Sequence, residues 1–173
     1  MKTLLDHNGI AETLRKLARE IAAATPKGAP LAIVGIRRRG ETIAERLIPL
    51  IAAEGIENIR HGALDITLYR DDLTTIGPKA TVRKTEIDFD ITDIWVVLVD
   101  DVLYTGRSVR AALDALIDLG RPRAVRLAVL ADRGRRELPI HADFVGMTIE
   151  TNAEQIVKVK LTEVDGVDKV DLV

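Results

Sequence analysis

Short apolar runs alternate with longer amphipathic segments along this chain, and this alternation limits the folds that it can adopt. The apolar runs, each of strand length, cover residues 31–34, 94–99 and 125–130. Segments with apolar residues at helical spacing cover residues 10–21, 41–54 and 108–119. Buried strands that alternate with amphipathic helices form a parallel sheet covered on both faces. We therefore expect an α/β fold with a central, mainly parallel sheet flanked by helices, in a single domain of residues 1–173.

Charge and composition exclude several classes of function. Lys and Arg number 25 against 27 Asp and Glu, a formal net charge of −2, and aromatic residues make up only 3%. A protein that acts mainly through nucleic-acid phosphates is usually basic, so the global charge gives no support to that role. The absence of Cys excludes disulfides and Cys nucleophiles. No apolar run has the length of a signal peptide or a membrane span, and we expect a cytoplasmic location and no membrane partner.

The segment before the most apolar run has a different character. Residues 64–69 alternate between apolar and polar side chains, which predicts a half-exposed strand. From Arg70 to about Glu86 the chain is polar, with Gly77 and Pro78 in the middle. A connection of this length in a compact domain is usually functional, and we predict a lid over a ligand site. Residues 156–161 alternate as an edge strand does.

The richest chemistry follows the apolar run of residues 94–99. Asp100 and Asp101 come directly after this run, and a turn with a glycine, residues 105–108, then leads into a helix. In open α/β sheets ligands bind at the carboxyl ends of the strands, and a helix start favours a phosphate. Carboxylates suit sugar hydroxyls, so the segment predicts a site for a ribose 5-phosphate. The alternative, in which the acidic pair only solubilises a loop, is favoured for an isolated Asp-Asp pair but not for the whole string.

Several strings carry a family resemblance. Val97 to Gly106 resembles the PRPP-binding motif of type I phosphoribosyltransferases (PRPP is 5-phosphoribosyl 1-diphosphate). Residues 64–73, 119–123 and 132–140 narrow the match, and together the strings closely resemble the bifunctional pyrimidine-operon regulator/uracil phosphoribosyltransferase family, PyrR. The resemblance implies the type I phosphoribosyltransferase fold with a mobile loop and a small hood. It also implies conversion of uracil and PRPP into UMP and pyrophosphate with Mg²⁺, in a homodimer or larger homo-oligomer.

The resemblance assigns roles to individual residues. The PRPP and 5-phosphate site comprises Asp100, Asp101, Val102, Leu103, Tyr104, Thr105, Gly106, Arg107 and Ser108. The pyrophosphate loop comprises Ile36, Arg37, Arg38, Arg39 and Gly40. Catalytic roles fall to Arg70, Asp71, Asp100 and Asp101, with Arg70 and Asp71 opening a mobile catalytic loop of about residues 70–86. Phe144 and Val145 lie near the base, and Mg²⁺ is held through PRPP and waters near Asp100 and Asp101, with no direct protein ligand. Arg83 and Lys84 of the loop are placed to reach the pyrophosphate.

Some of these features have simpler interpretations. A basic triplet such as residues 37–39 is often only a solvated charge run, but its place between glycines at a strand end favours a pyrophosphate clamp. Tyr104 is compatible with stacking or with packing, and Phe144 with the base site or with the core. His7, His61 and His141 make no ligand spacing, so roles outside catalysis are expected for them.

The family's second activity is binding of the pyrimidine-operon leader mRNA, which is stimulated by uridine nucleotides such as UMP or UTP. Arg15, Lys16 and Arg19 keep the first helix basic and are the candidate RNA contacts. Residues 150–155 are acidic where the family is basic, which weakens phosphate contacts. Two hypotheses therefore remain: a uracil phosphoribosyltransferase that also regulates its operon, and an RNA-binding nucleotide sensor whose catalysis is incidental or lost.

Overall fold

The computed structural model describes residues 1–76 and 84–173, and its centre is a five-stranded parallel sheet. In spatial order the strands are β3 (Arg60–Leu64), β2 (Leu31–Ile36), β4 (Trp95–Leu103), β5 (Ala124–Asp132) and β6 (Phe144–Thr148). The register pairs Gly35 with Val99 and Val99 with Ala128, so the carboxyl ends of the middle strands lie side by side. The expected parallel sheet is confirmed, and its strand order brings β2 next to β4 at the edge where the predicted site lies.

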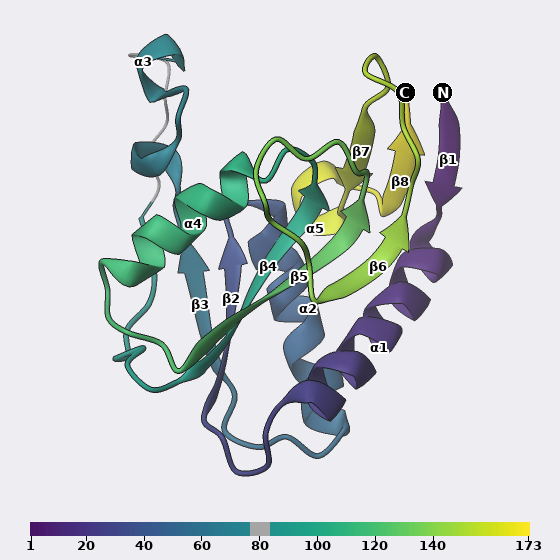
Figure 1. The fold of residues 1–173 in the computed structure, drawn as a ribbon. Helices are drawn as coiled ribbons and strands as arrows, with labels where there is room; N and C mark the ends of the chain where they lie inside the picture. The colour runs from purple at the N-terminus through teal and green to yellow at the C-terminus, as the bar shows by residue number, and fades with distance from the viewer. Residues whose placement is uncertain (77–83) are drawn as a thin grey trace.

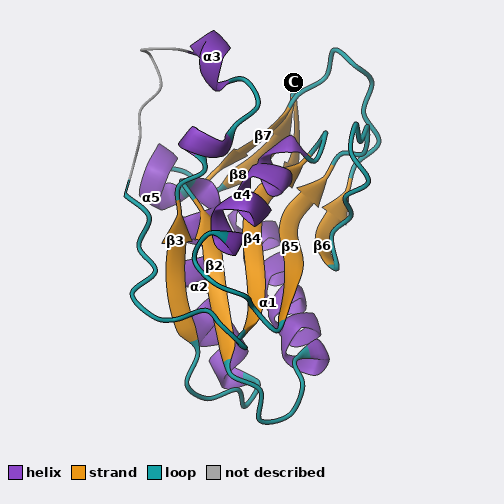
Figure 2. Cartoon of the chain, turned by 60° about the vertical axis from the view of Figure 1, so that its left-hand side comes forward, coloured by secondary structure: helices purple, strands orange, loops and turns teal. Residues whose placement is uncertain are grey.

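Helices cover both faces of this sheet (Figures 1 and 2). α1 (His7–Ala24) and α2 (Arg39–Ala53) pack on one face, and α4 (Arg107–Ile117) packs on the other. Because side chains of a strand alternate between faces, Val97 and Val99 of β4 join the core under α1 and α2. Val96 and Leu98 join the core under α4. Burial on both faces explains why β4 is a continuous apolar run.

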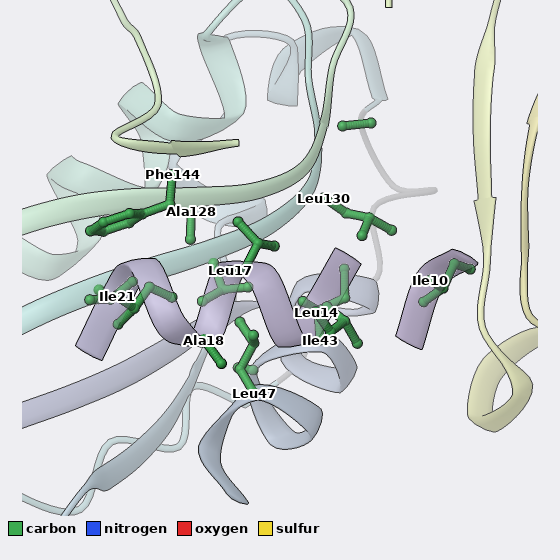
Figure 3. Close-up of a cluster of buried hydrophobic side chains, with 14 of the residues drawn as sticks. Ile10, Leu14, Leu17, Ala18, Ile21, Ile43, Leu47, Ala128, Leu130 and Phe144 are labelled. Atoms are coloured by element: carbon green, nitrogen blue, oxygen red, sulfur yellow. The ribbon is translucent and has the colours of Figure 1, made fainter. Parts of the chain in front are cut away.

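The apolar residues at helical spacing in α1 form one face of the helix, and this face is buried in the core. Ile10, Leu14, Leu17 and Ile21 recur every three or four residues and are at most 3% exposed. Figure 3 shows Phe144 of β6 above Ile21, with Leu14 next to Ile43 and Ala18 next to Leu47 of α2. The helix begins at His7, because the Asp6 side chain caps it by accepting a hydrogen bond from the Gly9 N–H (2.8 Å).

A second, three-stranded antiparallel sheet joins the two ends of the chain. Its strand order is β1 (Lys2–Leu5), β8 (Lys169–Leu172) and β7 (Val157–Lys160), so the strand expected near residues 156–161 is confirmed as an edge strand. The short helix α5 (Thr162–Asp165) connects β7 to β8. In Figure 1 this sheet and α5 lie at the end to which the arrowheads of β2, β3 and β4 point.

The structure corrects the strand predicted for residues 64–69. β3 ends at Leu64, and a 3₁₀ turn, η1 (Thr67–Tyr69), follows it. The Asp65 carboxylate accepts hydrogen bonds from the Thr67 N–H (3.0 Å) and hydroxyl (2.7 Å), and such local bonds compete with strand pairing. Of the loop expected at about residues 70–86, α3 (Leu73–Ile76) and residues 84–86 are described, whereas residues 77–83, including Arg83, lie outside the described residues. Within the described ranges no helix is long and apolar enough to cross a membrane.

Candidate active site at the carboxyl edge of the sheet

A polar cleft of about 260 Å³ opens at the carboxyl edge of the parallel sheet. It is lined by residues from three separate predicted segments: Ile36, Arg37, Arg38, Arg39, Asp65, Ile66, Thr67, Arg70, Asp100, Asp101, Val102 and Ser108. A smaller hollow of about 100 Å³ adjoins it between Asp100 and the start of α4. The structure therefore brings together the predicted pyrophosphate loop, the acidic pair and the phosphate turn.

The acidic pair lies within the last part of β4 rather than after it. Asp100 is 8% exposed, and its carboxylate accepts the Asp101 N–H (2.9 Å). The Asp101 carboxylate in turn accepts the Val102 N–H (2.9 Å). Burial, followed by the charge of Asp101, raises the pKa of Asp100 well above its ordinary value. Neighbouring carboxylates of this kind favour a ligand that brings a cation or hydroxyl donors to them.

The phosphate turn is held in a conformation that only glycine adopts easily. Gly106 caps α4 with φ of +92°, and the backbone N–H groups of the first helical turn follow it. The turn is supported from behind by the segment after β5, whose Glu137 and Leu138 N–H groups both donate to the Thr105 carbonyl (2.9 and 3.2 Å). The guanidinium of buried Arg133 lies 3.9 Å from the centre of the Tyr104 ring, so a cation covers one face of this ring.

The predicted pyrophosphate loop is fixed by close backbone contacts. A Cβ on Gly40 would lie 2.4 Å from the Val99 carbonyl oxygen, and one on Gly35 would lie 2.3 Å from the Glu41 Cα. The absence of side chains at these positions lets the start of α2 lie directly against the ends of β2 and β4. The peptide bond between Arg37 and Arg38 is cis.

The three arginines of this loop have different surroundings. Arg37 donates to Glu41 (2.9 Å) and lies 3.4 Å from Glu86, so its charge is already paired. Arg38 is exposed at the cleft. Arg39 makes a two-pronged contact with Asp165 of α5, whose carboxylate raises the pKa of Arg39.

The start of the predicted catalytic loop is docked on α4. Arg70 lines the cleft and pairs with Asp72 (2.7 Å). Asp71 pairs with Arg107 (2.8 Å) and Arg110 (2.5 Å), and it is not among the residues that line the cleft. Arg107 also pairs with Glu137 (2.9 Å), so the cation of the phosphate turn has two carboxylate partners.

The structure does not bring Phe144 and Val145 to this cleft. They are the first two residues of β6, an edge strand that β5 separates from β4, and the register pairs them with Ala128 and Val129 of β5. Neither is among the residues that line the cleft. Phe144 is 6% exposed and packs in the core under α1 (Figure 3).

The basic residues of α1 are all exposed, but one of them has backbone partners. Arg15 and Arg19 lie on the solvent side of the helix. Lys16 donates to the carbonyls of Val145 (3.0 Å) and Gly146 (3.3 Å) and so covers the open edge of β6. Of the candidate RNA contacts, Arg15 and Arg19 are therefore the more available.

Sequence reasoning did not identify the residues that support the predicted site residues through side-chain contacts. Asp165, Glu137 and Arg110 each contact a predicted site residue, and none belongs to a motif that marks a ligand site. Their partners are between 30 and 126 positions away along the chain. Only the tertiary structure shows these contacts.

Comparison with known proteins identifies the fold and the family. A family model described as a phosphoribosyl transferase domain matches residues 1–164. A protein of Thermus thermophilus named "Bifunctional protein PyrR" is 54% identical over 169 residues, covering 98% of this chain and 93% of the relative. The chain belongs to the PyrR family. A PyrR protein of Deinococcus radiodurans is 52% identical over 171 residues, with the same coverage of 98% and 93%.

Solved structures confirm the PyrR chain's fold. A hypoxanthine-guanine phosphoribosyltransferase of Bacillus anthracis matches with a TM-score of 0.71 at 23% identity, covering 91% of this chain and 86% of the other. The hypoxanthine phosphoribosyltransferase of Trypanosoma cruzi matches with a TM-score of 0.74 at 15% identity, covering 99% and 95%. At these identities the match establishes the type I phosphoribosyltransferase fold, which agrees with the sequence-based expectation.

Proposed function

We propose that this PyrR protein converts uracil and PRPP into UMP and pyrophosphate in the cleft at the carboxyl edge of its sheet. The observation that carries the proposal is the meeting of three segments there: the loop of residues 36–40, the acidic pair and the turn of residues 105–108. One PRPP molecule needs these three groups together, because its pyrophosphate, ribose hydroxyls and 5-phosphate are covalently linked. The near full-length match to proteins named bifunctional PyrR favours uracil as the base.

In the proposed reaction, the bond between C1′ of the ribose and N1 of uracil forms while the bond between C1′ and the pyrophosphate oxygen breaks. Uracil loses its N1 proton, and pyrophosphate leaves with the bonding electron pair. The sugar carries positive charge in the transition state, so Asp100 and Asp101 suit it electrostatically as well as through hydroxyl contacts. Arg38 and Arg39 line the cleft and suit the charge that develops on the leaving group.

The residues of the cleft fit a magnesium ion that arrives with its substrate. Within residues 1–76 and 84–173 no group of three or more His, Asp or Glu side chains is placed to hold a metal. PRPP oxygens and waters would be the ligands of the ion, and the carboxylates of the acidic pair would accept hydrogen bonds from those waters. When bound, Mg²⁺ neutralises charge on the leaving pyrophosphate. The chain's own contribution is to hold Asp100 and Asp101 on a rigid strand, so that hydroxyls and ion meet fixed oxygens.

The test is UMP formation from uracil and PRPP, with and without Mg²⁺, compared with guanine, hypoxanthine and orotate as bases. We expect uracil-selective turnover that requires Mg²⁺. Asp101→Asn should reduce turnover severely and leave the fold intact, because the residue is only half-buried and its backbone bonds remain. Asp143→Asn, which neutralises a carboxylate that accepts the Leu127 N–H and does not line the cleft, is the matched control. Near-normal turnover of Asp101→Asn would refute the assigned role.

The second half of the proposed function is regulation. We propose that the chain binds the leader mRNA of its pyrimidine operon in response to UMP or UTP, as the bifunctional name of its relatives implies. Exposed Arg15 and Arg19 favour this reading, because phosphate contacts supply much of the affinity for RNA. Binding that is tight, salt-sensitive and stimulated by UMP would support it, and a flat response to salt would count against it.

A further inference from the structure

The side chain of Arg39 is held in place by a carboxylate that does not line the cleft. Its Nη2 donates to Asp165 Oδ1 (2.7 Å) and its Nε donates to Asp165 Oδ2 (3.2 Å). This two-pronged geometry fixes both the position and the rotation of a guanidinium plane. Among the described residues no hydrogen bond from Arg39 Nη1 is found, and Arg39 itself lines the cleft near Asp101. One edge of the guanidinium is thus occupied, and the other remains for a ligand.

Asp165 is itself fixed by its surroundings. Its Oδ2 also accepts the Leu161 N–H (2.9 Å), and its side chain is 19% exposed. The turn that carries it is anchored to α2 a second time, because Arg46 donates to Glu163 (Nε, 2.9 Å) and to Asp168 (Nη1, 2.9 Å).

Arg39 and Arg46 are seven residues apart, which places them on the same side of α2 two helical turns from each other. The two arginine contacts therefore fasten the turn between β7 and β8 along α2. A carboxylate on a turn anchored in this way can hold the Arg39 side chain in one position, whereas a carboxylate on an unanchored loop would move together with that side chain.

We propose that Asp165 is a positioning residue for pyrophosphate binding: it holds the guanidinium of Arg39 so that its free edge is presented to the diphosphate group of PRPP or to inorganic pyrophosphate. The inference rests on the proposed function for the identity of the anion. It assigns a role in the site to the C-terminal part of the chain, which contributes no residue to the lining of the cleft.

A positioning role for Asp165 and simple electrostatics predict different changes in pyrophosphate affinity when the Asp165 carboxylate is neutralised. Asp165 is an anion near an anion site, so removing its charge without any change of geometry would strengthen pyrophosphate binding or leave it unchanged. Loss of the two-pronged contact frees the long Arg39 side chain to adopt other rotamers, and ordering it again upon binding costs entropy. A positioning role therefore predicts weaker binding after the carboxylate is neutralised.

The experiment is calorimetric titration of the full-length Asp165→Asn variant with inorganic pyrophosphate, with and without Mg²⁺. We expect the affinity to fall by about tenfold in both conditions, which corresponds to about 1.4 kcal/mol. In turnover the KM for PRPP should rise by a similar factor while the KM for uracil stays unchanged. Unchanged or tighter pyrophosphate binding would overturn the proposal, and so would a loss confined to the titration with Mg²⁺, because that result would make Asp165 part of a metal site.

Two further variants separate positioning from general loosening of the turn. Glu163→Gln weakens the second anchor on the same turn and should leave pyrophosphate affinity unchanged; an equal loss in this variant would contradict a specific role for Asp165. In an Arg39→Ala background, Asp165→Asn should no longer weaken binding, because its target is gone. A loss that persists in this background would likewise refute the proposed mechanism.

The titration also distinguishes the inference from the function on which it rests. If the wild-type protein binds pyrophosphate and Asp165→Asn weakens that binding, the positioning role stands even where no UMP is formed. If UMP is formed but Asp165→Asn binds pyrophosphate normally, the proposed function stands and the positioning role fails. If the wild-type protein binds no pyrophosphate, the positioning role is refuted directly.

Discussion

The contact between the start of α2 and the end of β4 gives a quantitative prediction for Gly40→Ala. A Cβ at this position would lie 2.4 Å from the Val99 carbonyl oxygen and 3.1 Å from the Asp100 Cα. Ordinary contacts begin at 3.4 Å, so α2 and the pyrophosphate loop must move away from β4 by about 1 Å. The obstacle is backbone, and no side chain can rotate to relieve it.

The displacement has two separable consequences. Overpacking of this kind costs about 1–3 kcal/mol of unfolding free energy. A shift of about 1 Å between groups that hold one substrate can lower the rate about 100-fold. We therefore expect kcat/KM for PRPP to fall by about two orders of magnitude in Gly40→Ala, measured as UMP formation at saturating uracil, on protein shown to be folded by urea denaturation.

Gly146→Ala is the matched control for this experiment. Its Cβ would also lie 2.4 Å from a backbone carbonyl oxygen, that of Leu130, and 2.6 Å from the Thr13 Cγ2, but at the contact of β6 with α1. The loss of stability should be similar, with kinetics close to wild type for the folded fraction. Equal kinetic losses in the two variants, or normal kinetics in Gly40→Ala, would refute the claim that this glycine sets the distance between loop and acidic pair.

Three further predictions test the frame around the site. The Asp168 side chain is 3% exposed, and its contact with Arg46 lowers its pKa. A lowered pKa in the folded state adds stability that is complete above the unfolded pKa of about 3.9 and is lost as the pH falls below it. Asp168→Asn should therefore cost about 3 kcal/mol in urea unfolding at pH 7 and progressively less in acid. Phe144→Ala should cost about 3–5 kcal/mol in the same assay and leave the KM for uracil unchanged, as expected of a core residue. Replacing Arg15 and Arg19 by Ala should lower the slope of log K against log salt for single-stranded leader RNA by about 0.7 per lost contact, with UMP formation unaffected.

The sequence predicts those parts of the site in which the polar residues lie next to a strand or helix that can be recognised from the local sequence. The run of residues 94–99 is buried on both faces, so its composition alone indicates a central strand, and the acidic pair must then lie at its carboxyl end. Gly106 marks the start of the next helix for an equally local reason, its positive φ. The family strings add the identity of the ligand, which no periodicity provides.

The predictions that failed did so where tertiary contacts or local hydrogen bonds decide. Residues 64–69 alternate like a strand, but the Asp65 side chain bonds to Thr67 and turns the chain at the end of β3. The resemblance places Phe144 near the base, whereas in the structure its side chain is 6% exposed and packs in the core under α1. An apolar residue at such a position carries no local signal that separates core from base site.

The residues that support the cleft suggest why the chain extends well beyond its PRPP motif. Every residue that lines the main cleft lies at or before Ser108. The segment after β5 nevertheless holds the phosphate turn through two bonds to the Thr105 carbonyl, and the turn after β7 holds Arg39 through Asp165. If the proposed function holds, the two ends of PRPP are bound by elements whose positions are fixed by separate supporting segments. Because both ends belong to one molecule, their separation must match it, and a change in either support should alter PRPP binding without altering any residue that touches PRPP.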